Sequence, residues 1–256
     1  MDDAVQLLCR SWQQGEHIGD LPAALRPLSR AHGYALQERW EAEVGHPIAG
    51  WKIAATSVAG QRHINVSGPL AGPIFAHRVH PDGARISLAG NGMRVAECEI
   101  VFTFERALAP RTAPYTRVEV VQALASVGPG IEVPDSRFAQ FEKAGEAQLI
   151  ADCACTNQML VGRAVKPDAR VDRLPTLELL ARLGDGRAHR GVGANVLGDP
   201  VEALVWLVNE LSTLGRTLER GQFVTTGACV PPIPVVPGDT VEADYGWIGH
   251  MQVSFA

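Results

Sequence analysis

The sequence lacks an excess of positive charge and has few cysteines. Its 256 residues carry 23 basic and 28 acidic side chains, a formal net charge of −5, and the charges are interspersed. We therefore expect no nucleic-acid partner, because phosphate backbones are bound by basic patches. The five cysteines are an odd number, and Cys98, Cys153, Cys155 and Cys229 lie in apolar or mixed stretches. We interpret them as reduced, buried thiols instead of a disulfide framework.

Long apolar runs and a secretory signal are also missing. Charge, Gly or Pro interrupts the apolar stretches well before the ~18–20 residues that a membrane span needs. The N-terminal stretch MDDAVQLLCRSWQQ has two acids where a signal peptide has a basic region followed by an apolar one. We therefore expect a cytoplasmic protein without a membrane partner. With 46% hydrophobic residues, the chain can bury a core without disulfides.

The sequence changes its texture at about residue 46, which predicts a helical N-terminal cap (1–46) and a β-rich catalytic body (47–256). In the cap, apolar residues such as Val5, Leu8 and Trp12 recur at helical spacing. In the body, short runs such as 94–105, 223–230 and 240–245 are typical of strands and are separated by Gly and Pro. The mixture predicts an α+β fold.

Two helices and two hairpins are expected within the body. One helix is predicted over 116–127, and the other begins at Asp199, an N-cap followed by Pro200, and ends near Gly215. The segment 184–186, Gly-Asp-Gly, predicts a hairpin turn, and 245–249 predicts the turn of the last hairpin. The Pro-rich segment 231–239 and the segment HINVSGPLAGPIF (63–75) are expected to be loops.

Two carboxylates share one face of the strand predicted over 94–105. Alternation puts Glu97 and Glu99 together, about 6.6 Å apart at ~3.3 Å per residue, and puts Cys98, Ile100 and Phe102 on the opposite, core face. Carboxylates this close repel unless solvent or a cation separates them, and hard oxygens are the ligands that Mg²⁺ or Mn²⁺ takes. A solvent-facing strand with two exposed acids is the alternative interpretation.

A second acidic segment, GIEVPDSRF (130–138), offers more candidates. Glu132 would be a third carboxylate, which would leave about half of an octahedral shell for substrate and water. Pro134 ends the predicted strand, so that Asp135, Ser136 and Arg137 lie at its rim, where a scaffold presents functional side chains. A surface turn with an exposed arginine is the alternative.

Lys52 is a lone cation in the apolar strand GWKIAATS (50–57). Lysine is seldom buried without a partner, and a desolvated lysine beside a metal-bound keto acid could pair with the carboxylate or relay a proton. A lysine that faces water is the alternative. His63 and His77 are more typical of surface residues at this stage, and the Cys-x-Cys pair at 153–155 lacks zinc-site spacing.

Taken in order, several segments resemble the hydratase/decarboxylase branch of the fumarylacetoacetate hydrolase superfamily. They are GWKIAATS, AGPIFAHRV, RVAECEIVFTFERAL, GIEVPDSRF, LIADCACTNQMLVG, GVGANVLGDPVEALVWLVNEL, FVTTG and VPGDTVEADYGWIGHMQVSF. The resemblance implies a mixed, rolled and barrel-like β-sheet with a helical N-terminal region. It also implies Glu97, Glu99 and Glu132 as ligands of Mg²⁺ or Mn²⁺, and Lys52 in contact with the substrate.

The same resemblance implies 2-hydroxy-2,4-dienoates and related 2-oxo acids from aromatic meta-cleavage pathways as substrates. Lys52, Asp135 and Arg137 are the expected catalytic residues. The expected substrate-binding residues are Ser136, Asp152, Thr156 and Thr226. Homo-oligomers are implied as well. Because related hydratases and decarboxylases associate, assembly with a sister enzyme of the same pathway is a second expected partnership.

The chain departs from the family at two places. Ala76 and His77 stand where several hydratases carry an acidic pair, and ADCACT (151–156) stands where the family has ADNASS, which places Cys153 and Cys155 at the usual Asn and Ser positions. These departures leave the preferred substrate open.

The favoured function is metal-dependent addition of water to a 2-keto-4-pentenoate-type 2-hydroxydienoate, which gives a 4-hydroxy-2-oxo acid. A 4-oxalocrotonate-type decarboxylase and a non-catalytic metal-binding assembly partner are the alternatives. Hydrolysis of a 1,3-diketone is less favoured, since His63 has no convincing Glu partner. Apolar Leu70, Pro73 and Phe75 favour an uncharged or alkyl substrate tail over a second carboxylate, whereas Arg78 or His77 could reverse that preference.

Overall fold

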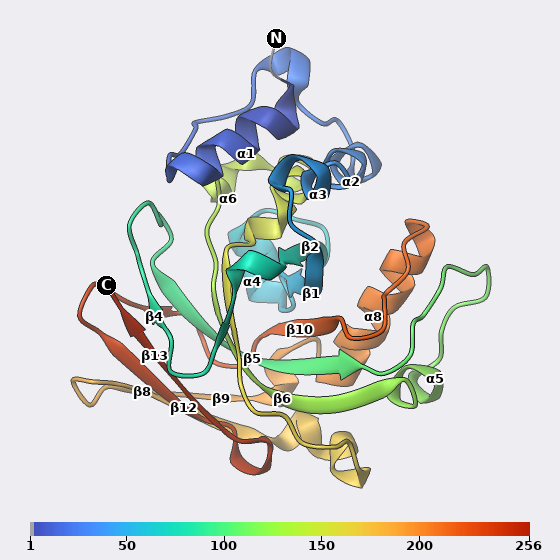
Figure 1. The fold of residues 1–256 in the computed structure, drawn as a ribbon, viewed down its shortest axis with the longest axis vertical. Coiled ribbons are helices and arrows are strands. Elements are labelled where there is room, and N and C mark those ends of the chain that lie inside the picture. Colours follow the sequence, from blue (N-terminus) through green and yellow to red (C-terminus); the bar gives the residue numbers. More distant parts are fainter. Residues whose placement is uncertain (1–2) are drawn as a thin grey trace.

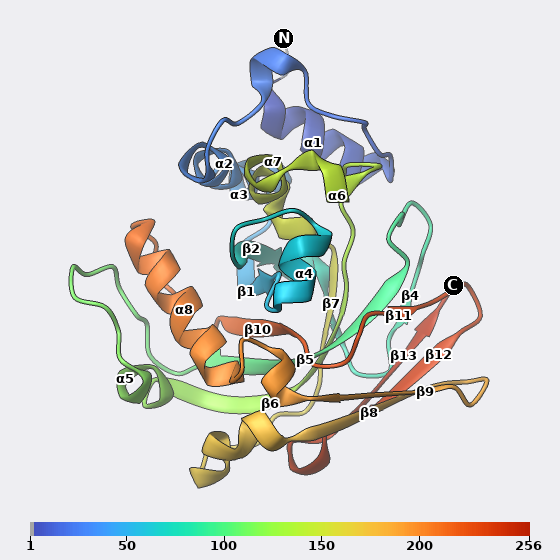
Figure 2. The same ribbon diagram turned by 180° about the vertical axis from the view of Figure 1, so that it is seen from behind.

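The N-terminal helices lie together at one end of the molecule (Figures 1 and 2). The computed structural model describes residues 3–256, in which α1 (Ala4–Gln14), α2 (Arg30–Gln37) and α3 (Trp40–Val44) form this end. Asp3 caps α1 by accepting hydrogen bonds from two backbone N–H groups, and Ser29 caps α2 in the same way with one. The predicted helical N-terminal region is confirmed, while the domain boundary at residue 46 stays a prediction.

A curled, mixed sheet of eight strands forms the centre of the described chain. Its order is β2–β1–β10–β5–β6–β7–β3, and β11 pairs with β5. β1 is parallel to β10 and β3 is parallel to β7, whereas the other pairs are antiparallel. The strands are β1 (Ile48–Ala54), β2 (Leu70–Phe75), β3 (Val79–Pro81), β5 (Val95–Phe104), β6 (Leu124–Val133), β7 (Gln158–Val161), β10 (Phe223–Ala228) and β11 (Ile233–Pro234). The expected rolled sheet is confirmed.

A second sheet of five strands has the order β4–β13–β12–β8–β9. Both expected hairpins, β8–β9 and β12–β13, belong to it. Its strands are β4 (Arg85–Ile86), β8 (Glu178–Leu183), β9 (Ala188–Val192), β12 (Thr240–Asp244) and β13 (His250–Phe255). Helix α8 (Pro200–Thr213) begins as predicted, because the Asp199 side chain accepts a hydrogen bond from the N–H of Val201. The shorter helices are α4 (Val58–His63), α5 (Arg117–Val121), α6 (Phe141–Ala144) and α7 (Glu146–Ala151).

The main core joins the sheets and helices into one packed interior. The face of β5 that alternation assigned to the core contributes Cys98, Ile100 and Phe102, all fully buried. Residues of α8 and of the second sheet belong to the same cluster. Phe75 at the end of β2 stacks on Trp40, which ties the N-terminal helices to the curled sheet.

Three sequence predictions of secondary structure need correction. The helix predicted over 116–127 ends at Val121, because the chain from Leu124 to Glu132 of β6 pairs with β5. The predicted loop 63–75 contains the fully buried strand β2, which tolerates Pro73 since it lies at the end of the strand order. The predicted loop 231–239 contains the two-residue strand β11.

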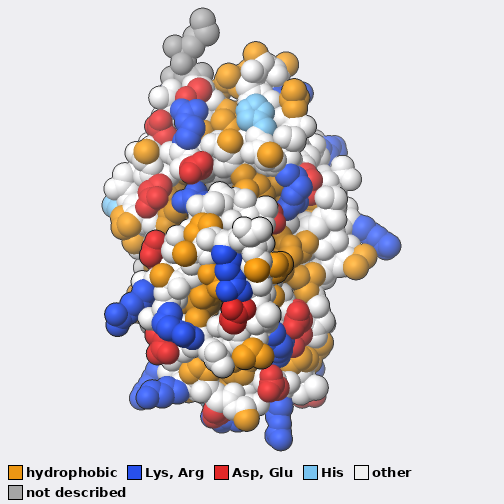
Figure 3. All heavy atoms as spheres, turned by 90° about the vertical axis from the view of Figure 1, so that its right-hand side faces the viewer, with side chains coloured by type: hydrophobic (Ala, Val, Ile, Leu, Met, Phe, Trp, Pro, Cys, Tyr) orange, Lys and Arg blue, Asp and Glu red, His pale blue; other side chains and the backbone are white. Residues whose placement is uncertain are grey.

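Charges of both signs are mixed on the face shown in Figure 3, where no large area carries one sign. Within residues 3–256, the helices are too short or too polar to cross a bilayer. All five cysteines are buried and unpaired, as expected for structural thiols.

Candidate metal centre and its surroundings

Three carboxylates from two neighbouring strands meet on the inner face of the curled sheet. Glu97 of β5 lies directly opposite Glu132 of β6, and Glu99 follows on the same face of β5. One ligand oxygen from each of the three lies within 4.8 Å of the others. Glu99 and Glu132 are each only 1% exposed. The alternative of a solvent-facing strand is therefore wrong.

Lys52 completes this cluster from β1. Its side chain is 3% exposed, and Nζ lies 2.7 Å from Oε1 of Glu132. Two strands, β10 and β5, separate β1 from β6 in the sheet, so the curl of the sheet brings these side chains together. Burial alone would lower the pKa of Lys52, but attraction to Glu132 and Glu97 raises it above its ordinary value. Lys52 therefore stays charged, and the water-facing alternative is wrong.

Strand β10 orients Glu99. The hydroxyl of Thr225 donates to Oε2 of Glu99, and the backbone N–H of Gly227 donates to the same oxygen at 2.8 Å. An irregularity of the β10–β5 pairing between Thr225 and Ala228 accompanies this contact. Gly227 has φ +98°, and a Cβ there would lie 2.2 Å from Oγ1 of Thr56, so glycine is required. One oxygen of Glu99 is thus fixed by its neighbours.

In this cluster, acidic groups outnumber basic groups by three to one. With all three carboxylates ionised, they and the one ammonium would carry a net charge of 1 − 3 = −2. Burial, with repulsion from Glu132, raises the pKa of Glu97 to about 7, and burial also raises the pKa of Glu99 and of Glu132. Neither oxygen of Glu132 accepts a hydrogen bond of good geometry from the described residues. A divalent cation would neutralise the excess charge and satisfy these oxygens, so the residues fit a hard metal such as Mg²⁺.

The segment after β6 is buried instead of forming the surface turn that was the alternative. Asp135, Ser136 and Arg137 are 4%, 1% and 1% exposed. The guanidinium of Arg137 donates to the Asp152 carboxylate, to the backbone carbonyl of Asp152, and to the carbonyl of Thr156 at 2.6 Å. The Ser136 hydroxyl donates to the other Asp152 oxygen at 2.7 Å. The ion pair is therefore satisfied from within the chain.

Arg137 stabilises a left-handed turn. Cys153, Ala154 and Cys155 have φ of +53°, +52° and +63°. For L-residues this conformation costs roughly 1–2 kcal/mol each, so the turn needs support from outside. Arg137 supplies it by binding the carbonyls of the residues on both sides of the turn. Burial raises the pKa of the Cys155 thiol to about 12, which keeps the thiol neutral.

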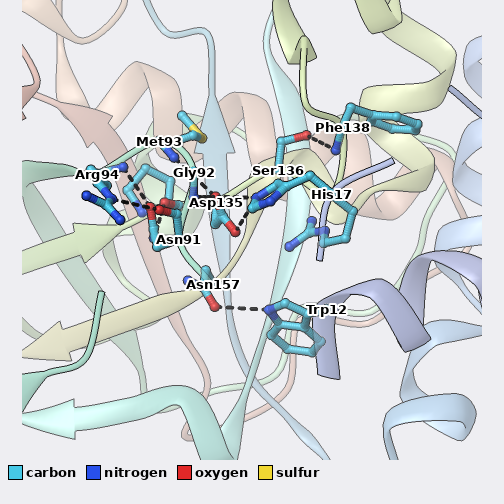
Figure 4. Close-up of polar contacts among 12 residues, drawn as sticks. Trp12, His17, Asn91, Gly92, Met93, Arg94, Asp135, Ser136, Phe138 and Asn157 are labelled. Carbon is cyan, nitrogen blue, oxygen red and sulfur yellow. Dashed lines mark hydrogen bonds and ion pairs between the residues drawn. The ribbon is translucent and has the colours of Figure 1, made fainter. Parts of the chain in front are cut away.

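Asp135 joins three separate segments, as Figure 4 shows. Its carboxylate accepts hydrogen bonds from the backbone N–H groups of Gly92, at 2.9 Å, and Met93, at 3.3 Å. Nε2 of His17, from the connection after α1, lies 3.2 Å from the other oxygen. Asp135 therefore fixes the loop that leads into β5 a few residues before Glu97.

The two adjacent threonines of β10 face different surroundings. Thr225, which the sequence reasoning missed, contacts Glu99, whereas the Thr226 hydroxyl donates to the carbonyl of Ile100 at 3.3 Å. Strand alternation could have identified Thr225 if the pairing of β10 with β5 had been known. The substrate-binding roles of Ser136, Asp152, Thr156 and Thr226 stay predictions. His77 is exposed and stacks on His46, with ring centroids 4.1 Å apart.

This chain is similar in sequence and in fold to known proteins. It is 30% identical over 257 residues to the 2-keto-4-pentenoate hydratase of Paraburkholderia xenovorans (strain LB400), which covers 99% of this chain and 94% of that protein. It is 29% identical over 229 residues to the 4-oxalocrotonate decarboxylase of Pseudomonas putida, 88% of this chain and 85% of that one. The solved 4-oxalocrotonate decarboxylase from Pseudomonas putida G7, complexed with magnesium and adipate, matches with a TM-score of 0.86 and 25% identity over 98% of this chain and 95% of that chain.

The family assignment is independent of any single relative. Residues 33–256, which include all four members of the carboxylate and lysine cluster, match the family described as Fumarylacetoacetate (FAA) hydrolase C-terminal. The curled sheet, the carboxylates on β5 and β6, and the lysine on β1 are features of this chain's own structure. The chain belongs to the fumarylacetoacetate hydrolase family.

Proposed function

We propose that this protein is a divalent-metal-dependent hydro-lyase. It adds water to a 2-hydroxy-2,4-dienoate of the 2-keto-4-pentenoate type and gives a 4-hydroxy-2-oxo acid in aromatic meta-cleavage catabolism. The observation that carries the proposal is the cluster of half-buried Glu97 with buried Glu99 and Glu132, and Lys52 beside it. The hydratase of Paraburkholderia xenovorans, which aligns over nearly the whole chain, supports the reaction type.

Glu97, Glu99 and Glu132 would hold the metal. Mg²⁺ is favoured because the solved decarboxylase is complexed with magnesium, and Mn²⁺ is proposed as a second metal that accepts the same hard oxygens. When bound, the metal supplies a Lewis acid that stabilises negative charge on the 2-oxygen of a 2-hydroxydienoate. Thr225 and the N–H of Gly227 keep Glu99 in a fixed orientation for this task.

Hydration requires two proton movements. The 2-hydroxyl group of 2-hydroxypenta-2,4-dienoate loses its proton while C5 gains one, which gives a 2-oxo-3-enoate; water then adds its hydroxyl at C4 and its proton at C3. Lys52 is the residue that we place at the developing charge. Because Glu132 and Glu97 keep its ammonium protonated, Lys52 can stabilise the enolate oxygen as a fixed positive charge.

Asp135 and Arg137 act, in this proposal, by positioning other groups. Both were expected to be catalytic, yet their polar atoms are directed at backbone groups, His17 and Asp152. Asp135 holds the loop before Glu97, and Arg137 holds the turn at 153–155. Their removal would therefore disturb the site through its geometry.

The first test is the ultraviolet decay of freshly generated 2-hydroxypenta-2,4-dienoate. Protein stripped with EDTA is assayed before and after addition of Mg²⁺ or Mn²⁺, and the product is identified. We expect metal-dependent formation of 4-hydroxy-2-oxopentanoate. Absence of decay with either metal, from folded protein that binds the metal, would contradict the hydratase proposal.

A decarboxylase is the second candidate. It is favoured by the solved 4-oxalocrotonate decarboxylase, which is complexed with the dicarboxylate adipate, and by Ala76 and His77 at the positions of the family's acidic pair. Release of CO₂ from 2-oxohex-3-enedioate would identify this activity, since hydration releases none. A third candidate is a non-catalytic assembly partner, which would bind metal and ligand without turnover. It is suggested by Cys153 and Cys155, which differ from the residues that the family usually has at these positions.

We further propose a cytoplasmic homo-oligomer, alone or associated with a sister enzyme of the pathway. The family resemblance supports this assembly, and the unpaired, buried state of the five cysteines agrees with a reducing compartment. Sedimentation velocity of the purified protein, alone and mixed with a pathway decarboxylase, tests both parts.

A further inference from the structure

A small apolar cluster lies inside the curled sheet, separate from the main core. Its buried members are Ile74, Val101, Met159 and Phe223, and partly buried Ala49, Val79 and Val161 pack against them. The four buried side chains come from β2, β5, β7 and β10, which are four strands of the eight-stranded sheet. The cluster contains only hydrocarbon and thioether groups.

This cluster directly adjoins the carboxylates. Met159 lies opposite Glu132 in the pairing of β7 with β6, and Gly130 lies opposite Glu99 in the pairing of β6 with β5. A Cβ placed on Gly130 would lie 2.5 Å from Cε of Met159 and 2.5 Å from Cγ2 of Val101. The two apolar side chains therefore meet over Gly130, beside two of the three proposed metal ligands.

We infer that Val101 and Met159, meeting over Gly130, form the wall that contacts the carbon chain of the substrate beyond its 2-oxygen. The inference rests on the proposed function, because that function places the 1-carboxylate and the 2-oxygen at the carboxylate cluster. The substrate class that fits this wall is a 2-hydroxydienoate or 2-oxo acid with a short, uncharged tail. A second carboxylate at the wall would lose its hydration without gaining a partner.

Among residues 3–256, the fully buried cations are Lys52 and Arg137, and they are already paired with Glu132 and Asp152. The wall therefore favours the substrate of the hydratase over the dicarboxylic substrate of the decarboxylase.

The residues that were expected to favour an uncharged tail are different ones. Leu70 and Phe75 belong to the main core, where Phe75 packs on Trp12 and Trp40. On β2, the residue that joins the apolar cluster is Ile74. The preference for an uncharged tail is retained, but it is assigned to Val101 and Met159.

The test measures binding of two unreactive six-carbon acids to the Mg²⁺-loaded protein by calorimetry. The acids are 2-oxohexanoate and 2-oxohexanedioate, which differ in a terminal methyl against a terminal carboxylate. We expect the monoacid to bind at least tenfold more tightly. Met159→Lys should narrow or reverse this ratio, whereas Met159→Leu, of similar volume, should retain it.

Two further variants keep the test decisive if Met159→Lys does not fold. Val101→Ala should improve binding of 2-oxoheptanoate relative to 2-oxohexanoate by about fourfold, the effect of one more buried methylene. Met251→Leu, in the main core, should leave every ratio unchanged. A chain-length ratio that Val101→Ala does not alter would contradict the wall.

The outcomes separate the wall from the proposed function. Metal-dependent binding of both acids, with a ratio near one that is insensitive to Met159 and Val101, overturns the wall and leaves the hydratase proposal intact. Metal-dependent binding with the expected ratios, but without hydration of the dienoate, supports the wall and overturns the hydratase reaction. Absence of metal-dependent binding of either acid overturns both.

Discussion

Two buried polar regions lie close together in the sequence and differ in how completely their groups are satisfied. Around Arg137 and Asp152, the guanidinium, the carboxylate and the neighbouring carbonyls all have partners within the chain. Around Glu132, three carboxylates face one ammonium, and both Glu132 oxygens lack a hydrogen bond of good geometry. A buried network whose polar groups all have partners stabilises the local backbone conformation. A buried cluster with unpartnered oxygens and excess negative charge is suited to binding a cation.

The largest expected effect comes from disrupting the buried pair of Arg137 and Asp152. Arg137→Met should lower the free energy of unfolding by about 3–5 kcal/mol, because it leaves the buried Asp152 carboxylate without its partner. Urea denaturation measures the loss. Arg170→Met is the matched control, since its pair with Asp168 is about half exposed (47% and 48%) and, screened by solvent, should contribute far less to stability. Equal losses in the two variants would contradict a structural role for the buried pair.

The next largest effect is expected from a substitution in the carboxylate cluster. Glu99→Gln should weaken Mg²⁺ binding by about 100-fold or more, or about 2.8 kcal/mol, because a metal ligand loses its charge. The metal-free protein should keep or gain stability, since repulsion among the carboxylates falls. Calorimetric titration with Mg²⁺ and urea denaturation with EDTA measure both. Glu242→Gln, exposed on β12, is the control, and unchanged Mg²⁺ affinity in Glu99→Gln would refute the ligand assignment.

The sequence could predict the parts of the site that depend on local geometry. Alternation along one strand is enough to place Glu97 and Glu99 on one face and Cys98 on the core face. The contact of Lys52 with Glu132 was beyond such reasoning, because it depends on the curl of a sheet in which two strands separate them. The residue types alone suggested a shared metal site, and the family resemblance supported that suggestion.

Other failures came from long-range pairing that overrides local preference. The helical pattern over 116–127 is real, but the residues after Val121 gain more from the ladder with β5. The importance of Thr225 depends on the register of β10 with β5 and on the irregularity before Ala228. Burial of Arg137 depends on the left-handed turn at 153–155, which non-glycine residues rarely adopt.

Mg²⁺ affinity and the stability of the metal-free protein should both depend on pH through Glu97. With the pKa of Glu97 raised to about 7 in the folded, metal-free protein, Mg²⁺ must displace a proton below that pH. Through the proton on Glu97, Mg²⁺ affinity should fall by up to about tenfold for each pH unit below 7. Because the folded pKa exceeds the unfolded value near 4.5, the metal-free protein should lose stability as pH rises from about 4.5 through 7.

Thermal unfolding with EDTA and with Mg²⁺, at pH 5.5 and pH 8, measures this linkage. The stabilisation by Mg²⁺ should be larger at pH 8. Glu97→Gln removes the titrating group and should flatten the pH dependence in the metal-free protein. An equal Mg²⁺ effect at both pH values would show that Glu97 does not exchange its proton for the metal.

The smallest effect is expected from a residue that orients a proposed metal ligand, because the ligand itself is retained. Thr225 and Thr226 are adjacent and fully buried, yet only Thr225 donates to Glu99. Thr225→Val should weaken Mg²⁺ binding by about tenfold, the lower end for a group that orients a ligand. Thr226→Val loses a hydrogen bond to a backbone carbonyl, so it should cost about 1 kcal/mol of stability and leave Mg²⁺ affinity unchanged.

Calorimetry on both threonine variants separates orientation from packing. Both substitutions exchange a hydroxyl for a methyl in the same buried strand, so their costs in stability should be similar. A difference in Mg²⁺ affinity between them then reports the bond to Glu99 alone. If the two variants bound Mg²⁺ equally, Gly227 N–H would be sufficient to hold Glu99, and the unsatisfied region would need less support from β10 than its contacts indicate.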